Sequence, residues 1–147
     1  RQRQNKMTGV ADDIWHGIRR ELEEGITAGE SIADLSARIR TSFNDLSRER
    51  ARTVAMTETA AAYGTARQSA MEEAGIPFKR WLTSGNANVR AAHENANGQT
   101  GGIDAPFQIT NPATGERDAI DHPGDPAGQP WNVINCHCVS VPVAGPE

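Results

Sequence analysis

The stretch Gly75-Ile76-Pro77 separates two parts of the chain that differ in composition. All 8 prolines lie at Pro77 or beyond it, and 8 of the 14 glycines follow Ile76. A glycine at the end of a helix, with a proline shortly after it, stops the helix from continuing. We therefore predict an α+β fold, with a helical part at residues 1–75 and a small, loop-rich antiparallel β part at residues 76–147. The two parts are expected to pack together as one domain.

The helical part is expected to contain about three helices. In the first helix, Ile14, Ile18 and Leu22 recur at a spacing of four residues and so share one face. We expect Gly25 to end this helix, because glycine is unfavourable inside a helix.

The second and third helices are predicted from their terminal residues. Ser31 is a suitable N-cap for a helix that ends at about Ile39. The third helix is expected to start near Asp45 or Ser47 and to run to about Ala74. Its inner face is predicted to consist of small residues, namely Ala51, Ala55, Ala62 and Ala66.

The β-rich part contains short strand patterns between turn residues. Residues 78–83 predict one strand, and residues 131–143 predict the clearest strand by their alternation. Residues 86–93 are expected to form two helical turns. Gly, Pro, Asn and Asp dominate residues 95–102 and 111–128, which predicts loops or hairpin turns there.

Composition excludes several classes of protein. The net charge is −4 with 23% charged residues, which does not favour a basic nucleic-acid binder or a disordered chain. No apolar run approaches the ~20 residues that a membrane helix needs, so no membrane association is expected. The 2 cysteines cannot form a disulfide framework, and a reducing compartment is expected.

The triplet Cys136-His137-Cys138 is the most suggestive local feature. In an extended backbone the two thiols point to one side and His137 points to the other. Two thiolates need two further ligands for a tetrahedral zinc site, and His93 and His122 are the candidates. The alternative from the residues alone is a pair of small buried thiols without a metal.

Other polar groups have structural and functional interpretations that stay open at this point. Asn86, Arg90 and His93 would share a helix face and could face an anion, or they could hold the following loop. Glu58 lies inside the small-residue face of the third helix, where it could be a general base or a partner of a local arginine. The carboxylates around His122 could serve a metal-dependent nuclease, although Asp125 fits a turn better.

Several short segments follow one another in a characteristic order along the chain, namely Arg50–Thr59, Gly75, Lys79–Thr83, Val89–His93, Asn97–Gln99, Pro123–Pro126 and Asn132–Cys138. In this order they resemble the phage head morphogenesis family, the Mu F-like minor head proteins. The resemblance covers about residues 30–142. Two positions depart from the family pattern, since Asn86 stands where the family usually has Asp and His137 where it usually has Arg.

The resemblance implies a non-catalytic minor capsid protein of a tailed bacteriophage. Such a protein would bind the portal protein or the major capsid protein during procapsid assembly in the host cytoplasm and would end in the virion. Contact with DNA gains no support from the charge. The resemblance further implies a metal or metal-like cluster of His93, Cys136 and Cys138, with Glu58 and Arg90 holding the two parts together and Asn135 in the interacting segment.

Two alternatives to this structural role remain. One is a metal-dependent nuclease or other hydrolase that uses His93 and nearby carboxylates. The other is the packaging module of a phage-delivered toxin, which is compatible with a chain that starts without Met.

Overall fold

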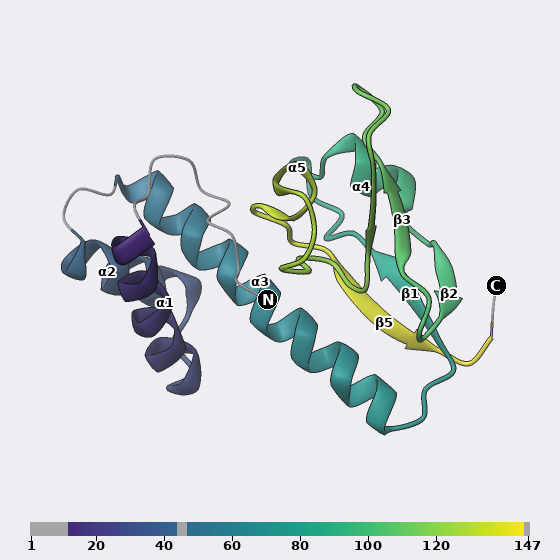
Figure 1. Cartoon of the computed structure of the whole chain (residues 1–147), viewed down its shortest axis with the longest axis horizontal. Helices are drawn as coiled ribbons and strands as arrows, with labels where there is room; N and C mark the ends of the chain where they lie inside the picture. The colour runs from purple at the N-terminus through teal and green to yellow at the C-terminus, as the bar shows by residue number, and fades with distance from the viewer. Residues whose placement is uncertain (1–11, 44–46, 146–147) are drawn as a thin grey trace. The chain divides into compact units, whose positions relative to one another are not determined.

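The structure is a computed structural model that describes residues 12–43 and 47–145. Its helices are α1 (Asp12–Thr27), α2 (Ile32–Ser42), α3 (Arg48–Glu73), α4 (Ala91–Ala96) and α5 (Pro130–Val133). Its strands are β1 (Phe78–Leu82), β2 (Thr100–Gly102), β3 (Phe107–Thr110), β4 (Arg117–Ile120) and β5 (Val139–Val143). Helices therefore precede antiparallel strands, and the predicted α+β class is confirmed (Figure 1).

The chain divides into two compact units. Unit 1 comprises residues 1–59 and unit 2 comprises residues 60–147, so the boundary lies within α3. The change from helices to strands comes later, between Glu73 and Phe78. The predicted packing of residues 1–75 and 76–147 into one domain stays a prediction.

Unit 1 is built from α1, α2 and the first part of α3. The capping box at Ser31 confirms the predicted start of the second helix, since Ser31 Oγ accepts from Asp34 N at 3.1 Å and Asp34 Oδ2 accepts from Ser31 N at 3.2 Å. All three helices contribute buried apolar side chains, which are Ile18, Leu22, Leu35, Ile39, Ala51, Val54 and Ala55.

The prediction that Gly25 ends the first helix is wrong. The helix α1 continues to Thr27, and Gly29 follows it with a φ of +75°. A Cβ atom at Gly25 would overlap the side chain of Leu35 on α2. The glycine therefore allows close approach of a neighbouring helix, and the left-handed residue that terminates α1 is Gly29.

Helix α3 has the predicted ends but a different buried face in its second part. Ser47 Oγ accepts from Arg50 N at 3.2 Å, and Gly75 follows the helix with a φ of +70°. The alternative start at Asp45 lies outside the described residues. Ala62 is only half-buried and Ala66 is exposed, so their predicted place on an inner face is wrong. The side chains of α3 that are buried within unit 2 are instead Ala61, Gln68 and Met71.

Unit 2 contains a three-stranded antiparallel sheet and a two-stranded hairpin. The sheet has the order β2-β1-β5, and β3 pairs with β4 (Figure 1). In β1, Lys79 and Trp81 are buried and alternate with more exposed residues, as a strand with one core face requires. In β3, Phe107 and Ile109 are buried in the same alternating way.

Two predicted elements of unit 2 are wrong in their extent. The strand expected over residues 131–143 is limited to β5, because Pro130 starts a short helix and Asn135 has a φ of +55°. The helical turns expected over residues 86–93 begin only at Ala91, because Arg90 has an extended backbone. Asn86, Arg90 and His93 therefore do not share one helix face.

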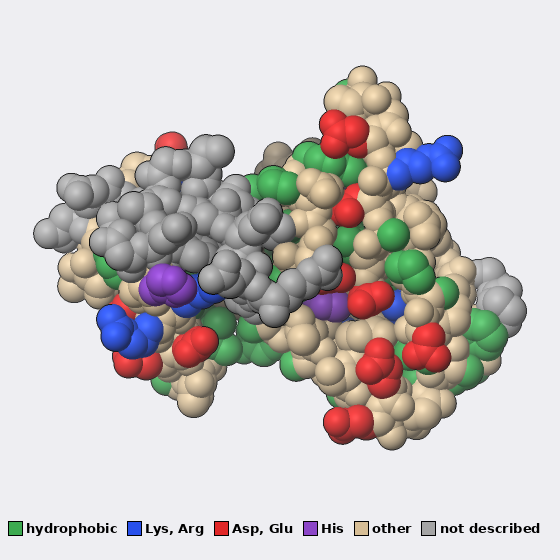
Figure 2. Space-filling model, in the orientation of Figure 1, with side chains coloured by type: hydrophobic (Ala, Val, Ile, Leu, Met, Phe, Trp, Pro, Cys, Tyr) green, Lys and Arg blue, Asp and Glu red, His purple; other side chains and the backbone are tan. Residues whose placement is uncertain are grey.

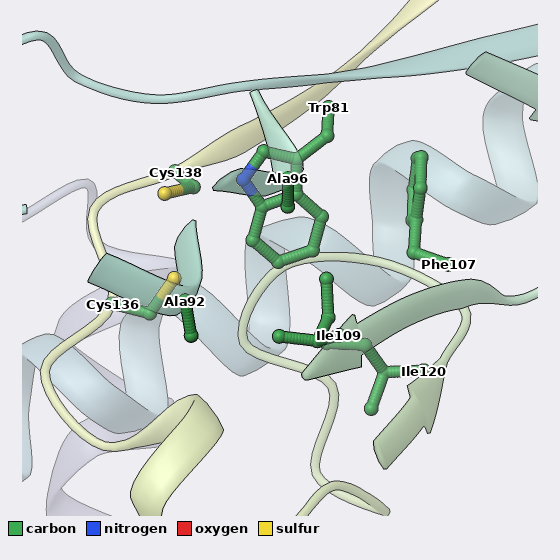
Figure 3. Packing of buried hydrophobic residues seen from close by; sticks show 8 residues of the cluster. All are labelled: Trp81, Ala92, Ala96, Phe107, Ile109, Ile120, Cys136 and Cys138. Atoms are coloured by element: carbon green, nitrogen blue, oxygen red, sulfur yellow. The ribbon is translucent and has the colours of Figure 1, made fainter. Parts of the chain in front are cut away.

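The core of unit 2 joins both sheets, α4 and the two cysteines. Trp81 packs edge-on against Phe107, with ring centroids 5.3 Å apart. The buried cluster consists of Trp81, Ala92, Ala96, Phe107, Ile109, Ile120, Cys136 and Cys138 (Figure 3). The cysteines are thus part of a core that also contains four large apolar side chains.

The surface gives no sign of a basic nucleic-acid interface on the visible face of unit 2. Asp and Glu side chains are scattered over that face, and Lys and Arg side chains are few (Figure 2). Among the described residues, no helix has the length and hydropathy needed to cross a membrane.

Candidate metal centre

The two cysteines lie between the short helix α5 and strand β5. Asn135 turns the chain after α5 with its positive φ, and Cys136 and Cys138 then point into the core with exposed fractions of 2% and 9%. His137 between them is exposed. Side chains two residues apart share one side of an extended backbone, so both sulfur atoms face the same region.

His93 of α4 meets both sulfur atoms. Its Nδ1 lies 3.7 Å from Cys136 Sγ and 3.5 Å from Cys138 Sγ. The ligand atoms of His93, Cys136 and Cys138 all lie within 4.8 Å of one another, and all three residues are buried. The structure therefore brings together three of the four residues that were predicted as metal ligands.

A chain of hydrogen bonds determines which nitrogen of His93 carries the proton. Asp118 Oδ2 accepts from Asn132 Nδ2 at 2.9 Å, since a carboxylate can only accept. Asn132 Oδ1 is thereby turned to His93 Nε2, at 2.8 Å. This assigns the proton of His93 to Nε2 and leaves the lone pair of Nδ1 directed at the thiols.

Arg90 anchors the segment that carries the cysteines. Its two terminal nitrogens donate to the carbonyl oxygens of Trp131, at 2.7 Å, and Ile134, at 2.6 Å. These carbonyls lie in and directly after α5, shortly before Cys136. Because Arg90 is also the N-cap residue of α4, this clamp holds α5 next to the helix that carries His93.

The pKa values of the two thiols shift in opposite directions. A hydrogen bond from Cys138 lowers the pKa of Cys136 to about 4, against the opposing effect of burial. The pKa of Cys138 is raised, first because it is the donor to Cys136 and second because it is buried. The lowered pKa of Cys136 favours its thiolate, which is the form of cysteine that binds metals.

Trp81 presents a further polar group to this region. Its ring lies 5.0 Å from the ring of His93, and its nitrogen-bearing edge is turned toward the cysteines (Figure 3). The buried Nε1–H acts on the Cys138 thiol, whose thiolate form it favours, and has no other hydrogen-bond partner among the described residues. An N–H donor in this place favours negative charge on the sulfur atoms.

The distances fit a tetrahedral metal ion. With zinc–sulfur and zinc–nitrogen bonds of about 2.3 and 2.05 Å, a tetrahedral angle places sulfur and nitrogen about 3.6 Å apart. The observed separations of 3.7 and 3.5 Å lie on either side of this value. Thiolates and a neutral imidazole are also the donors that zinc prefers.

His122 lies in a different environment from the other three candidates. Its Nδ1 donates to the carbonyl oxygen of Pro123 at 2.8 Å, and its Nε2 accepts from Thr65 Oγ1 at 3.2 Å. The ring is buried beside Gly64, where a Cβ atom would overlap it. His122 does not belong to the group of ligand atoms around Cys136 and Cys138.

The other residues that the sequence singled out lie outside the His-Cys-Cys group. Glu58 is half-buried in unit 1, Arg90 belongs to unit 2, and the prediction that they hold the two parts together stays a prediction. Asn135 is exposed at the turn before Cys136. Asp125 serves a turn, as predicted, since its carboxylate accepts from the backbone of Asp121 and Ala127, both at 2.9 Å.

Sequence reasoning missed the roles of Asn132 and Asp118. Both residues are far from His93 along the chain, and no spacing rule connects an asparagine of one helix with a histidine of another. The only signal was that a metal-bound histidine normally donates its second N–H to an oxygen atom. That rule predicts that an acceptor exists but not which residue provides it.

These features define a small α+β protein with a buried His-Cys-Cys group that fits a metal ion. The chain belongs to the family described as Phage Mu protein F like protein, whose model matches residues 16–141. It is also similar to the uncharacterized protein YqbB of Bacillus subtilis (strain 168), with 34% identity over 125 residues. That match covers 83% of this chain and 39% of the relative, so the chain spans about two-fifths of YqbB. No solved structure matches the chain significantly.

Membership of this family confirms the resemblance that the sequence motifs suggested. It associates the chain with bacteriophages and with the morphogenesis of the phage head. The match includes unit 2 up to Val141 and therefore the whole His-Cys-Cys group.

Proposed function

We propose that the chain is a non-catalytic minor capsid protein that binds the portal protein or the major capsid protein during procapsid assembly. The observation that carries this proposal is the family match over residues 16–141, which spans most of both units. The protein acts in the host cytoplasm during assembly and remains in the virion.

The bonding of the site residues supports a structural role. Both terminal nitrogens of Arg90 are engaged by backbone carbonyls, and the second nitrogen of His93 is engaged by Asn132. No carboxylate belongs to the metal-binding group that the described residues form. A nuclease that relies on carboxylate ligands therefore gains no support from the geometry.

The cofactor in this proposal is one zinc ion bound by His93 Nδ1, Cys136 Sγ and Cys138 Sγ. The sulfur–nitrogen distances and the soft donor set support zinc. The ion would link α4 to the segment between α5 and β5, and its binding free energy would add to the stability of unit 2. Asn132 and Asp118 would hold the imidazole in the required tautomer.

The assembly role is tested by co-expression with the portal protein and the major capsid protein encoded by the same phage genome. Tagged chain is expected to retain one of these proteins through size-exclusion chromatography, and procapsids are expected to contain a few copies of it. The portal and major capsid proteins of an unrelated phage serve as the matched control and should not be retained. Failure of the folded chain to associate with either protein of its own phage would refute the proposal.

The zinc ion is tested by native mass spectrometry and elemental analysis of the purified chain. One zinc per chain is expected, and Cys136→Ser or Cys138→Ser should remove it. A chain that folds and binds no zinc after reconstitution would refute the metal assignment while leaving the assembly role to its own test.

A hydrolase is the second candidate, and one observation favours it. A cavity of about 170 Å³ borders His93 and Cys138, so a bound metal ion would lie close to solvent. Cleavage of DNA or of model esters by the zinc-loaded chain, abolished by a chelator and by Cys138→Ser, would establish this function in place of the structural one.

A further inference from the structure

The cavity beside the His-Cys-Cys group is lined mainly by amide, hydroxyl and imidazole groups. His93 and Cys138 form the part of its wall that belongs to the metal-binding group. Asn86, Arg90 and Asn135 lie around it, and none of the described residues that line it is Asp or Glu. The space is therefore polar and without negatively charged carboxylate side chains.

The number of protein donors leaves one coordination position of a zinc ion to another ligand. The described residues offer three ligand atoms, whereas zinc in proteins takes four ligands. Cys136 does not line the cavity, but His93 and Cys138 do. A fourth ligand can therefore approach the group from the cavity, past His93 and Cys138.

We propose that the fourth ligand of the metal is a carboxylate oxygen of a molecule bound in this cavity, an inference that rests on the metal site of the proposed function. A zinc ion with two thiolates and one neutral imidazole carries no net charge. The positive charge of Arg90 then dominates the cavity, which favours an anionic ligand over a cation.

The cavity has room for a small ligand. Its volume is about 170 Å³. Acetate or the side chain of a glutamate fits this space. The side-chain amide of Asn86 can donate a hydrogen bond to the second carboxylate oxygen. The carboxylate comes either from a free small acid or from a glutamate or aspartate of a protein segment.

His137 provides the structural alternative to an external ligand. Its exposed imidazole lines the same cavity, and it lies between the two cysteines. If this ring turned inward and bound the metal, the site would have four protein ligands and no free position. The test must therefore separate His137 from an added carboxylate.

The test uses the full chain loaded with Co²⁺, whose visible absorption reports the ligands and the geometry of the site. Loss of the absorption bands in Cys136→Ser confirms that Co²⁺ occupies the proposed site, and a wild-type chain that takes up no Co²⁺ refutes the metal site itself. With Co²⁺ bound, added acetate is expected to shift the bands until the effect saturates. The His137→Ala variant is expected to bind Co²⁺ and to respond to acetate in the same way.

A pair of capped tripeptides distinguishes the sources of the carboxylate. A peptide with a central glutamate should reproduce the acetate shift if the ligand is a protein side chain, and its glutamine counterpart should have no effect. A response to acetate alone assigns the cavity to a free small acid. Bands that do not respond to any carboxylate, or that change in His137→Ala before any addition, would overturn the inference and leave the metal site standing.

Discussion

Replacement of Asn132 by Leu tests the idea that this residue prepares His93 for metal binding. Asn132 is fully buried, and its Oδ1 lies 2.8 Å from His93 Nε2. Leucine has a similar shape but accepts no hydrogen bond. The Nε2–H of His93 would lose its acceptor, and the imidazole could then place its proton on Nδ1, where it would oppose a metal ion.

The magnitude follows from these lost bonds. A buried donor without a partner costs about 1–3 kcal/mol, so the free energy of unfolding should fall by that amount. Loss of the residue that orients a metal-bound histidine weakens metal binding about 10- to 100-fold, equivalent to about 1.4–2.8 kcal/mol. The effect on zinc affinity is the more specific of the two, because many buried substitutions reduce stability.

Zinc affinity is measured by competition with a chromophoric chelator, and stability by urea denaturation of the metal-free chain. The control Asn95→Leu makes the same substitution at an exposed position of α4, the helix that carries His93, and should leave zinc affinity unchanged and stability within about 0.5 kcal/mol. If Asn132→Leu does not fold, Asp118→Asn provides the second measurement, since it keeps an acceptor for Asn132 Nδ2 while removing the charge. A folded Asn132→Leu chain that binds zinc as tightly as the wild type would refute the reasoning.

Three further predictions concern stability, measured by urea denaturation. Gly124→Ala should lower the free energy of unfolding by about 1–3 kcal/mol more than Gly115→Ala does. Both glycines have a positive φ, but only at Gly124 would a Cβ atom press on Ala60, at 3.0 Å. Equal losses of stability in the two variants would contradict this. Ser31→Ala should cost about 1 kcal/mol through loss of the capping box, and an unchanged midpoint would contradict it. Burial lowers the pKa of Lys79, so the unfolded chain binds more protons than the folded chain as the pH approaches 10.5, and the free energy of unfolding should rise with pH there. Lys79→Met should reduce this rise. An identical dependence of stability on pH in the variant and the wild type would refute the assignment.

The parts of the fold that were predicted correctly depend on local rules. Ser31 starts a helix and Gly75 ends one, through hydrogen bonds and backbone angles that involve only neighbouring residues. Gly25 was misread because its role depends on Leu35 of another helix, and a single segment contains no information about that contact. Local signals therefore predicted where elements end, except where a neighbouring element decided the outcome.

The candidate site was predicted in part for a similar reason. Cys136 and Cys138 face the same side because this property of extended backbone holds whether or not the segment belongs to a strand. The prediction of a long strand was wrong, yet the orientation of the thiols did not depend on it. The sequence predicted both His93 and His122 as the two further ligands. Which histidine lies near the sulfur atoms depends on three-dimensional distance, and the structure brings only His93 to them.

The environments of the two histidines show what separates a candidate ligand from a core histidine. Each ring is buried, and each has one nitrogen bonded to an oxygen acceptor of the chain, Asn132 for His93 and the carbonyl of Pro123 for His122. The difference lies at the other nitrogen. For His122 it meets Thr65 Oγ1, which can donate a hydrogen bond to it, whereas for His93 it meets two sulfur atoms. Of these two histidines, only His93 therefore combines the tautomer that a metal needs with sulfur atoms at metal-binding distance. The hydrogen bonds that link Asp118, Asn132 and His93 fix this tautomer and so prepare His93 to bind a metal together with the two cysteines.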